Sequence, residues 1–322
     1  MTPVAAVGAR QKKKKPGATL AHRAEFYAMR GTIRALRALS WDRAAAMGAK
    51  LGELGYRPFG IRKRVVERQI AAAFPALSHA EVIDLARESY RHLGRSSIET
   101  ALLGSIGRDG LMKLVETVEG WDLLEEVMAR GKGLILVTGH MGNWELGGSY
   151  IASRGVPLDA IGRGMANPLF DEWLNRGREE MGITVVHDSE AVRRTPRSLR
   201  AGRAVGFVAD QGVLGLASTF VPFFGRPAKT PRGAAVFALR FEVPVLFVVA
   251  IRKPNGRFRL VFEPVEIAAT GDKDTDVDAI VARYTQLLEK WVRVAPAQYF
   301  WQHRRWKRQP PDTPPELRDP SA

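Results

Sequence analysis

The chain contains no cysteine among its 322 residues. Disulfide bonds and thiolate nucleophiles are therefore excluded, and any zinc site would lack its commonest ligand. Hydrophobic residues nevertheless make up 45% of the sequence. This proportion and the chain length suffice to bury a sizeable core, either in one large domain or in one domain with an appended helical part.

Long apolar runs are also missing. A helix that crosses a bilayer needs roughly 18 or more apolar residues. The longest uncharged stretch, 211–225, is shorter and is broken by glycines and by Pro222. By this test we expect that the chain does not span a membrane, which leaves open attachment to the surface of one.

Several common catalytic motifs are absent as well. No Gly-x-Gly-x-x-Gly follows a strand, so a dinucleotide site is weakly supported. The sequence has no Walker-type phosphate loop with its lysine, no Gly-x-Ser-x-Gly elbow and no His-Glu-x-x-His zinc helix. These absences disfavour a serine hydrolase of the elbow type and a zinc protease.

Positive charge, in contrast, is abundant and unevenly placed. The formal net charge is +15, and residues 1–70 hold sixteen Lys/Arg against four Asp/Glu. Such a block attracts nucleic acid, anionic lipid headgroups or an acidic protein. No nucleic-acid recognition motif accompanies the charge, so no nucleic-acid partner is expected. Residues 1–18 lack periodicity and are predicted to form a disordered basic tail.

The segment after this tail has helical periodicity. Residues 21–56 carry one apolar stripe, interleaved with arginines, whose members are Phe26, Met29, Ile33, Leu36 and Leu39. This pattern fits a basic amphipathic helix in a membrane interface, or a surface helix that packs its stripe against the domain. A second helix is predicted from Ser78, because Glu81 completes a capping box three residues later.

From about residue 113 to residue 308, β-branched runs alternate with amphipathic segments, as is typical of α/β proteins. We predict strands at 115–118, 134–138, 157–161, 183–187 and 204–209, with helices between them at 121–130, 144–153, 168–181 and 190–200. A loop at 211–230, a helix at 231–241, a strand at 243–251, a hairpin into 258–262 and a helix at 275–294 should follow.

The predicted fold class is therefore α/β. It has a mixed, mostly parallel central sheet flanked by helices, and an N-terminal amphipathic helical section at 19–112. The helical part and the α/β core, 113–308, would form one domain spanning 19–308. The proline-rich residues 309–322 are predicted to be disordered.

The most informative motif is Gly139-His140-Met141-Gly142-Asn143-Trp144-Glu145, which directly follows the predicted strand at 134–138. In open α/β sheets, reactive groups gather beyond the carboxyl ends of the strands. A histidine that a carboxylate holds in one tautomer can deprotonate an alcohol as it attacks a carbonyl. His140 and Glu145 are thus a candidate general base and its orienting acid. The alternative is a histidine with a purely structural role.

The histidine motif resembles the His-x-x-x-x-Glu signature of glycerolipid-type acyltransferases. Its longer form resembles the branch that contains the bacterial lipid A late (lauroyl and myristoyl) acyltransferases and the phosphatidylinositol mannoside acyltransferases. Three further blocks resemble that branch in the same order: Arg163 with Asn167-Pro168 and Asp171; Ala209-Asp210-Gln211 with Phe223-Phe224-Gly225, Thr230 and Gly233; and the terminal run from Tyr299 to Trp306. The likeness spans about residues 20–308.

The resemblance implies roles for individual residues. His140 would be the base and Glu145 its partner. Asp210 follows its own predicted strand, so it can orient His140 in place of Glu145, or else hold Gln211 and the next loop. Arg163 would stabilise an oxyanion or grip an acceptor phosphate, unless it only forms a surface ion pair. The other candidate substrate-binding residues are Asn143, Asn167 and Gln211, with Asn143 chiefly supporting the turn.

The resemblance also implies a reaction and its partners. A fatty acyl group would pass from acyl carrier protein, or from acyl-CoA, to a hydroxyl of a lipid A precursor or related glycolipid. Lysophospholipid or phosphatidylinositol-mannoside acylation is the alternative activity, and a basic membrane- or nucleic-acid-binding protein is the non-enzymatic one. No metal and no bound cofactor are expected. Because the N-terminal segment is arginine-rich where many relatives are hydrophobic, we expect peripheral or monotopic attachment to the cytoplasmic face of the inner membrane.

Overall fold

The computed structural model describes residues 17–212, 215–267 and 270–322. Its α-helices are α1 (Leu20–Leu36), α2 (Trp41–Tyr56), α3 (Lys63–Ala73), α4 (His79–Leu114), α5 (Trp121–Ala129), α6 (Trp144–Ser153), α7 (Pro168–Glu180), α8 (Ala191–Arg200), α9 (Gly233–Phe241) and α10 (Lys273–Val294). Short 3₁₀ helices cover η1 (Asp188–Glu190), η2 (Pro296–Gln298) and η3 (Pro315–Leu317). Its strands are β1 (Val115–Glu119), β2 (Leu134–Thr138), β3 (Leu158–Gly162), β4 (Ile183–His187), β5 (Ala204–Val208), β6 (Ser218–Phe223), β7 (Arg226–Pro231), β8 (Val245–Arg252) and β9 (Phe258–Val265).

A seven-stranded sheet forms the centre of the molecule, in the order β1-β9-β8-β2-β5-β3-β4. The strands β8, β2, β5, β3 and β4 run parallel to one another, whereas β9 pairs antiparallel with β8 and parallel with β1. The predicted mixed, mostly parallel sheet flanked by helices is therefore confirmed. The strands that sequence periodicity predicted agree with these strands to within a few residues.

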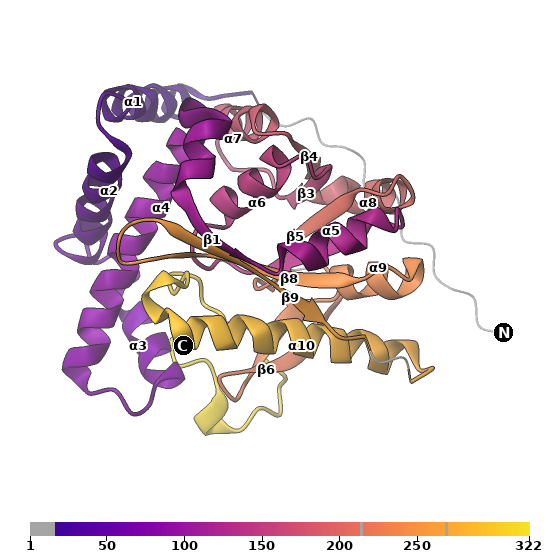
Figure 1. Cartoon of the computed structure of the whole chain (residues 1–322). Helices are drawn as coiled ribbons and strands as arrows, with labels where there is room; N and C mark the ends of the chain where they lie inside the picture. The colour runs from indigo at the N-terminus through magenta and orange to yellow at the C-terminus, as the bar shows by residue number, and fades with distance from the viewer. Residues whose placement is uncertain (1–16, 213–214, 268–269) are drawn as a thin grey trace.

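Helices cover both faces of this sheet, with α10 on one side and α6 and α7 on the other (Figure 1). The side chains of β2 alternate between two core clusters, so both faces of the sheet are buried. Ile135 and Val137 belong to the core cluster on the α9 and α10 side, while Leu134 and Leu136 belong to the cluster with α5 and α6. A strand that is buried on both faces reads as a continuous apolar run in the sequence.

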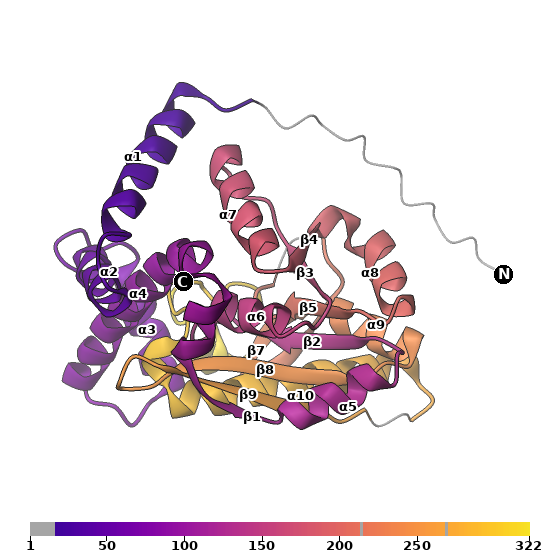
Figure 2. The same cartoon turned by 45° about the horizontal axis from the view of Figure 1, so that its top comes forward.

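The N-terminal section differs from the single helical segment predicted at 21–56. It forms two helices, because the chain turns at residues 37–40 and α2 begins after the N-cap Ser40. In Figure 2, α1 extends beside α7, away from the sheet. The stripe residues Ile33 and Leu36 are buried in a small cluster that includes Leu102 of α4. The stripe therefore packs against the domain, as one of its two interpretations predicted.

Glycines allow α2 and α4 to pack closely. A Cβ at Gly52 would collide with the carbonyl oxygen of Tyr90, and one at Gly94 would collide with that of Gly48. The capping box predicted at Ser78 and Glu81 is confirmed at the start of α4. None of the helices in the described ranges is long and apolar enough to cross a membrane.

Two segments predicted to lack regular structure are ordered. The predicted loop 211–230 contains the antiparallel hairpin β6–β7, and its residues 213–214 lie outside the described ranges. The tail 309–322 packs on the body, where Asp319 accepts hydrogen bonds from Arg304 at 2.6 and 3.0 Å and Thr313 is buried. Its partners are distant in sequence, so composition alone does not indicate them. Most of the predicted tail 1–18, residues 1–16, also lies outside the described residues.

Candidate active site

Two neighbouring strands bring His140 and Asp210 together at the carboxyl edge of the sheet. Thr138, the last residue of β2, pairs with Val208, the last residue of β5. His140 and Asp210 each lie two residues beyond this pair. Although 70 positions separate them in sequence, His140 Nδ1 lies 2.6 Å from Asp210 Oδ1.

The turn that presents His140 is fixed by its neighbours. Gly142 has a φ of +61°, and a Cβ there would collide with the carbonyl oxygen of Ala250. Asn143 is buried and caps α6, since its Oδ1 accepts from the Leu146 amide at 3.0 Å. Burial lowers the pKa of His92 to about 4, so this neutral ring donates from Nε2 to the Gly142 carbonyl at 3.0 Å. Asn143 thus supports the turn, and its predicted contact with substrate remains a prediction.

The Asp210 carboxylate sets the protonation behaviour of His140. Burial alone would lower the pKa of His140, but the charge and hydrogen bond of Asp210, together with the charge of Glu145, raise it above its ordinary value. Burial alone would raise the pKa of Asp210, yet His140 and Arg305 lower it to about 2. Asp210 is therefore ionised at neutral pH and favours the tautomer of His140 that carries its proton on Nδ1.

This arrangement leaves Nε2 of His140 available for chemistry. Within the described ranges, Nε2 has no hydrogen-bond partner, and 23% of the side chain is exposed. Trp144 packs edge-on against the imidazole at a centroid distance of 4.7 Å, and Phe300 lies 5.8 Å away. The Gln211 amide nitrogen lies 3.2 Å from Nδ1, so Gln211 adjoins the pair as well. A neutral imidazole held in this way can accept a proton at Nε2.

Glu145, the partner that the motif suggested first, forms a different interaction. Its carboxylate accepts a two-pronged hydrogen bond from Arg178 of α7, with a distance of 2.9 Å from Nε to Oε2. Its charge still contributes to the raised pKa of His140. In this structure the residue that holds Nδ1 is Asp210, and Glu145 joins the start of α6 to α7.

The two remaining predicted residues lie near the carboxyl end of β3. Arg163 directly follows β3 and is exposed, and across the described part of the chain its guanidinium has no hydrogen bond or ion pair. Asn167 caps α7 through its Oδ1, which accepts from the Leu169 amide at 3.1 Å, and its Nδ2 donates to the His22 carbonyl at 3.0 Å. Both ends of the Asn167 amide are therefore occupied, whereas Arg163 is free to bind a ligand.

Sequence reasoning did not assign roles to several residues that surround the pair. The buried Tyr299 lies beside Asp210, and burial next to this carboxylate raises the pKa of Tyr299 well above its ordinary value. Arg305 is buried too and is held by Thr230, whose hydroxyl lies 2.6 Å from its Nη2. Both residues lie in the terminal block of the family resemblance, and that block was the signal that could have found them.

Glu99 also supports the turn that presents His140. This carboxylate is fully buried, forms an ion pair with Arg252 and accepts a hydrogen bond from Asn143 Nδ2 at 3.1 Å. Its position on α4 made contact with the site conceivable, but spacing alone gave no indication of it. In the part of the chain that the structure describes, no group of three or more acidic or histidine side chains is placed to hold a metal ion.

Comparison with known proteins decides the family. The family model of the bacterial lipid A biosynthesis acyltransferases matches residues 11–308. The chain belongs to this family. It is accordingly an O-acyltransferase, and the resemblance inferred from the four motif blocks is confirmed.

Individual relatives of this acyltransferase are distant but cover most of its length. It is 27% identical over 270 residues to the lipid A biosynthesis lauroyltransferase of Escherichia coli K12, covering 83% of this chain and 86% of the relative. It is 28% identical over 267 residues to the palmitoleoyltransferase of the same organism, covering 82% and 85%. The phosphatidylinositol mannoside acyltransferase of Mycobacterium tuberculosis H37Rv is 25% identical over 260 residues, covering 79% and 80%.

Proposed function

We propose that the protein transfers a fatty acyl group from a thioester donor to a hydroxyl of a lipid A precursor or related glycolipid, with His140 as general base. The observation that carries this proposal is the His140–Asp210 pair, whose Nε2 is unpaired among the described residues at the carboxyl edge of the sheet. Family membership supports the reaction class.

The proposed reaction needs no covalent enzyme intermediate. Nε2 of His140 removes the proton of the acceptor hydroxyl while the oxygen attacks the thioester carbonyl carbon. The tetrahedral intermediate then expels the donor thiolate, which takes the proton from the imidazolium, so that an ester and a free thiol leave. Direct transfer is favoured because the chain has no cysteine and, among the described residues, no serine is hydrogen-bonded to the His140 side chain.

Asp210 stabilises this cycle electrostatically. It is ionised throughout, so it orients the neutral imidazole and balances the charge of the imidazolium that forms during attack. Glu145 adds a weaker, more distant negative charge. Arg163 is the proposed donor to the oxyanion or to a phosphate of the acceptor, because its guanidinium is exposed and unpaired within the described ranges. Gln211 is the proposed neighbour of the bound substrate.

The names of the relatives favour particular acceptors. Curated relatives are named for lauroyl and palmitoleoyl transfer in lipid A biosynthesis, which favours a lipid A precursor. Acylation of phosphatidylinositol mannoside is the alternative, since more distant relatives carry that name. Acyl carrier protein, or acyl-CoA, is the proposed donor. We place the reaction at the cytoplasmic face of the inner membrane, where a basic protein would meet anionic lipid.

The test is a transfer assay with a panel of lipid acceptors. The donor is a labelled fatty acyl group, carried as a thioester either on acyl carrier protein or on CoA. We expect His140→Ala to lower the rate of transfer about 10²–10⁴-fold, because the general base is lost. His79→Ala is the matched control, since His79 is exposed at the start of α4. Comparable transfer by His140→Ala and by the wild type would refute the assignment. A mannoside acceptor that reacts faster than a lipid A precursor would select the alternative.

A further inference from the structure

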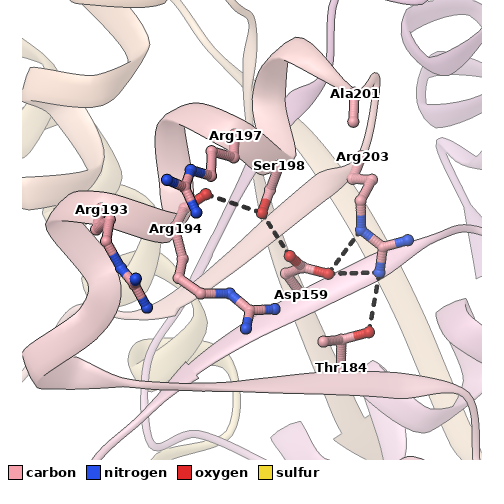
Figure 3. A pocket seen from close by; sticks show the side chains of 8 residues that line it. All are labelled: Asp159, Thr184, Arg193, Arg194, Arg197, Ser198, Ala201 and Arg203. Carbon is pink, nitrogen blue, oxygen red and sulfur yellow. Dashed lines mark hydrogen bonds and ion pairs between the residues drawn. The ribbon is translucent and has the colours of Figure 1, made fainter.

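A polar cavity lies beside α8, lined by residues of β3, β4 and α8 and by Arg203 (Figure 3). Its volume is about 350 Å³, which is in the size range of small-molecule sites. Four arginines line it, namely Arg193, Arg194, Arg197 and Arg203, together with one carboxylate, Asp159. The lining therefore carries a clear excess of positive charge.

The cavity is separate from the candidate active site. Asp159 of β3 pairs with Val205 of β5, which in turn pairs with Ile135 of β2. Ile135 precedes His140 by five residues, so the cavity lies roughly 15 Å back along the strands. It is also two strands to the side, since β5 separates β2 from β3. A group bound in the cavity would not touch His140.

One arginine of the cavity is held rigidly. Arg203 donates from Nε to the buried Asp159 carboxylate at 2.7 Å, and from Nη2 to Thr184 Oγ1 at 3.0 Å. Ser198 of α8 donates to the same carboxylate. Asp159 is thus neutralised within the wall. The Nη1 of Arg203 has no acceptor among the described residues and is available to a ligand.

Two other arginines have no counter-charge in the described part of the chain. Arg194 and Arg197 lie three residues apart on α8, on the side that lines the cavity. Their guanidinium groups make no hydrogen bond or ion pair with any described residue, whereas Arg193 is paired with Glu190 at 3.2 Å. Bringing unpaired like charges into one cavity is unfavourable unless an anion lies between them.

We propose that this arginine cavity binds a ligand that carries a phosphate monoester or a pyrophosphate. The guanidinium groups of Arg194 and Arg197 can each donate a pair of charge-assisted hydrogen bonds to the phosphate oxygens. The fixed Arg203 offers its Nη1 as a third donor. Three guanidinium groups match the several oxygens and the double negative charge of a phosphate better than a single carboxylate does. The proposal does not depend on the role of His140.

Inorganic pyrophosphate is the probe for this site. Calorimetric titration of the full chain should show saturable binding. Because each lost guanidinium removes charged hydrogen bonds, Arg194→Gln and Arg197→Gln should each raise Kd at least about tenfold, and the double variant should raise it more. Arg130→Gln, an exposed arginine paired with Glu126 on α5, is the matched control and should change Kd less than twofold.

A second arm distinguishes a lipid headgroup from a soluble phosphate. Phosphatidylcholine vesicles with and without 20% phosphatidic acid are titrated against pyrophosphate-loaded protein. Displacement of pyrophosphate only by the vesicles with phosphatidic acid identifies a lipid headgroup, and no displacement identifies a soluble ligand. If the ligand binds in the arginine cavity, Arg194→Gln and Arg197→Gln should weaken the binding of pyrophosphate and of the lipid headgroup alike.

The proposal fails if wild-type protein shows no saturable binding of pyrophosphate, or if the folded double variant binds with the wild-type Kd. Folding is monitored by thermal unfolding, and the exposed Arg197→Gln single variant serves if the double variant is unstable. His140→Ala should bind pyrophosphate as the wild type does. This variant separates a failure of the cavity from a failure of the acyl-transfer proposal.

Discussion

Asp210 and Glu145 are both carboxylates near the candidate base, but they have different partners. Asp210 is buried, accepts a hydrogen bond from Nδ1 of His140 at 2.6 Å and lies beside Tyr299. Glu145 lies only five residues after His140 and is bound instead by Arg178. The pairing of the strands therefore decides which carboxylate contacts His140, and closeness in sequence does not. Because β2 and β5 are parallel and adjacent, the residues that follow their carboxyl ends lie side by side.

The difference between the two carboxylates lies in what each one holds in place. Asp210 acts directly on the imidazole, through a hydrogen bond and a charge at contact distance. Glu145 acts on His140 only through its charge, and its hydrogen bonds join α6 to α7. We therefore expect Asp210 to matter mainly for catalysis and Glu145 mainly for stability.

The largest effect should come from Asp210→Asn. The asparagine keeps the shape of the side chain but loses the charge that stabilises the imidazolium and selects the tautomer. By analogy with other His–Asp pairs, we expect kcat/KM to fall about 10³–10⁴-fold in the transfer assay. Asp188→Asn is the control, since Asp188 contacts His187 at the end of β4 in a more exposed pair. A fall of less than tenfold would show that Asp210 does not orient the base.

Glu145→Gln should produce a smaller effect of a different kind. Breaking the largely buried pair with Arg178 should lower the free energy of unfolding by about 1–3 kcal/mol, measured by urea denaturation. The double variant Glu145→Gln/Arg178→Gln should recover part of this loss, because it leaves no unpaired charge. Glu126→Gln, which breaks an exposed pair, should cost less than about 1 kcal/mol. The comparison would be reversed if the folded Glu145→Gln variant transferred acyl groups more slowly than the Asp210→Asn variant.

The smallest effect should come from Tyr299→Phe, which removes the hydroxyl group that lies beside Asp210. We expect a few-fold loss of kcat, and a shift of the pH profile to higher pH because the less solvated carboxylate holds the His140 proton more tightly. The exposed Tyr27→Phe is the matched control. An unchanged profile would mean that Tyr299 only fills space.

The sequence predicted the elements of the sheet well because most of its strands are short apolar runs bounded by turns. It also predicted that His140 would follow β2 and that Asp210 would follow β5. The order of the strands was not predictable in the same way, because pairing between β2 and β5 depends on contacts between segments far apart in sequence. The choice between Glu145 and Asp210 depends on that pairing, so the sequence left both open.

Other differences between prediction and structure also have identifiable reasons. The hairpin β6–β7 lies in a stretch rich in glycine and proline, which is typical of loops. The tail after residue 308 is ordered by partners such as Arg226, which donates to the Glu316 and Arg318 carbonyls at 2.7 and 2.9 Å. The amide of Asn167 caps α7 and holds α1, and its contact with substrate remains a prediction. The contacts of Arg226 with the tail and of Asn167 with α1 join residues far apart in sequence.

The most direct test of the account is the pH dependence of kcat/KM for wild-type protein and the two carboxylate variants. The neutral imidazole is the base, so the rate of the wild type should rise with pH through the pKa of His140, which lies above its ordinary value. For Asp210→Asn the rise should move to clearly lower pH at a much reduced maximum, and for Glu145→Gln it should move only slightly. The opposite result would contradict the assignment of Asp210 as the partner of the base. In that case Asp210→Asn would leave the pH profile unchanged and Glu145→Gln would shift it strongly.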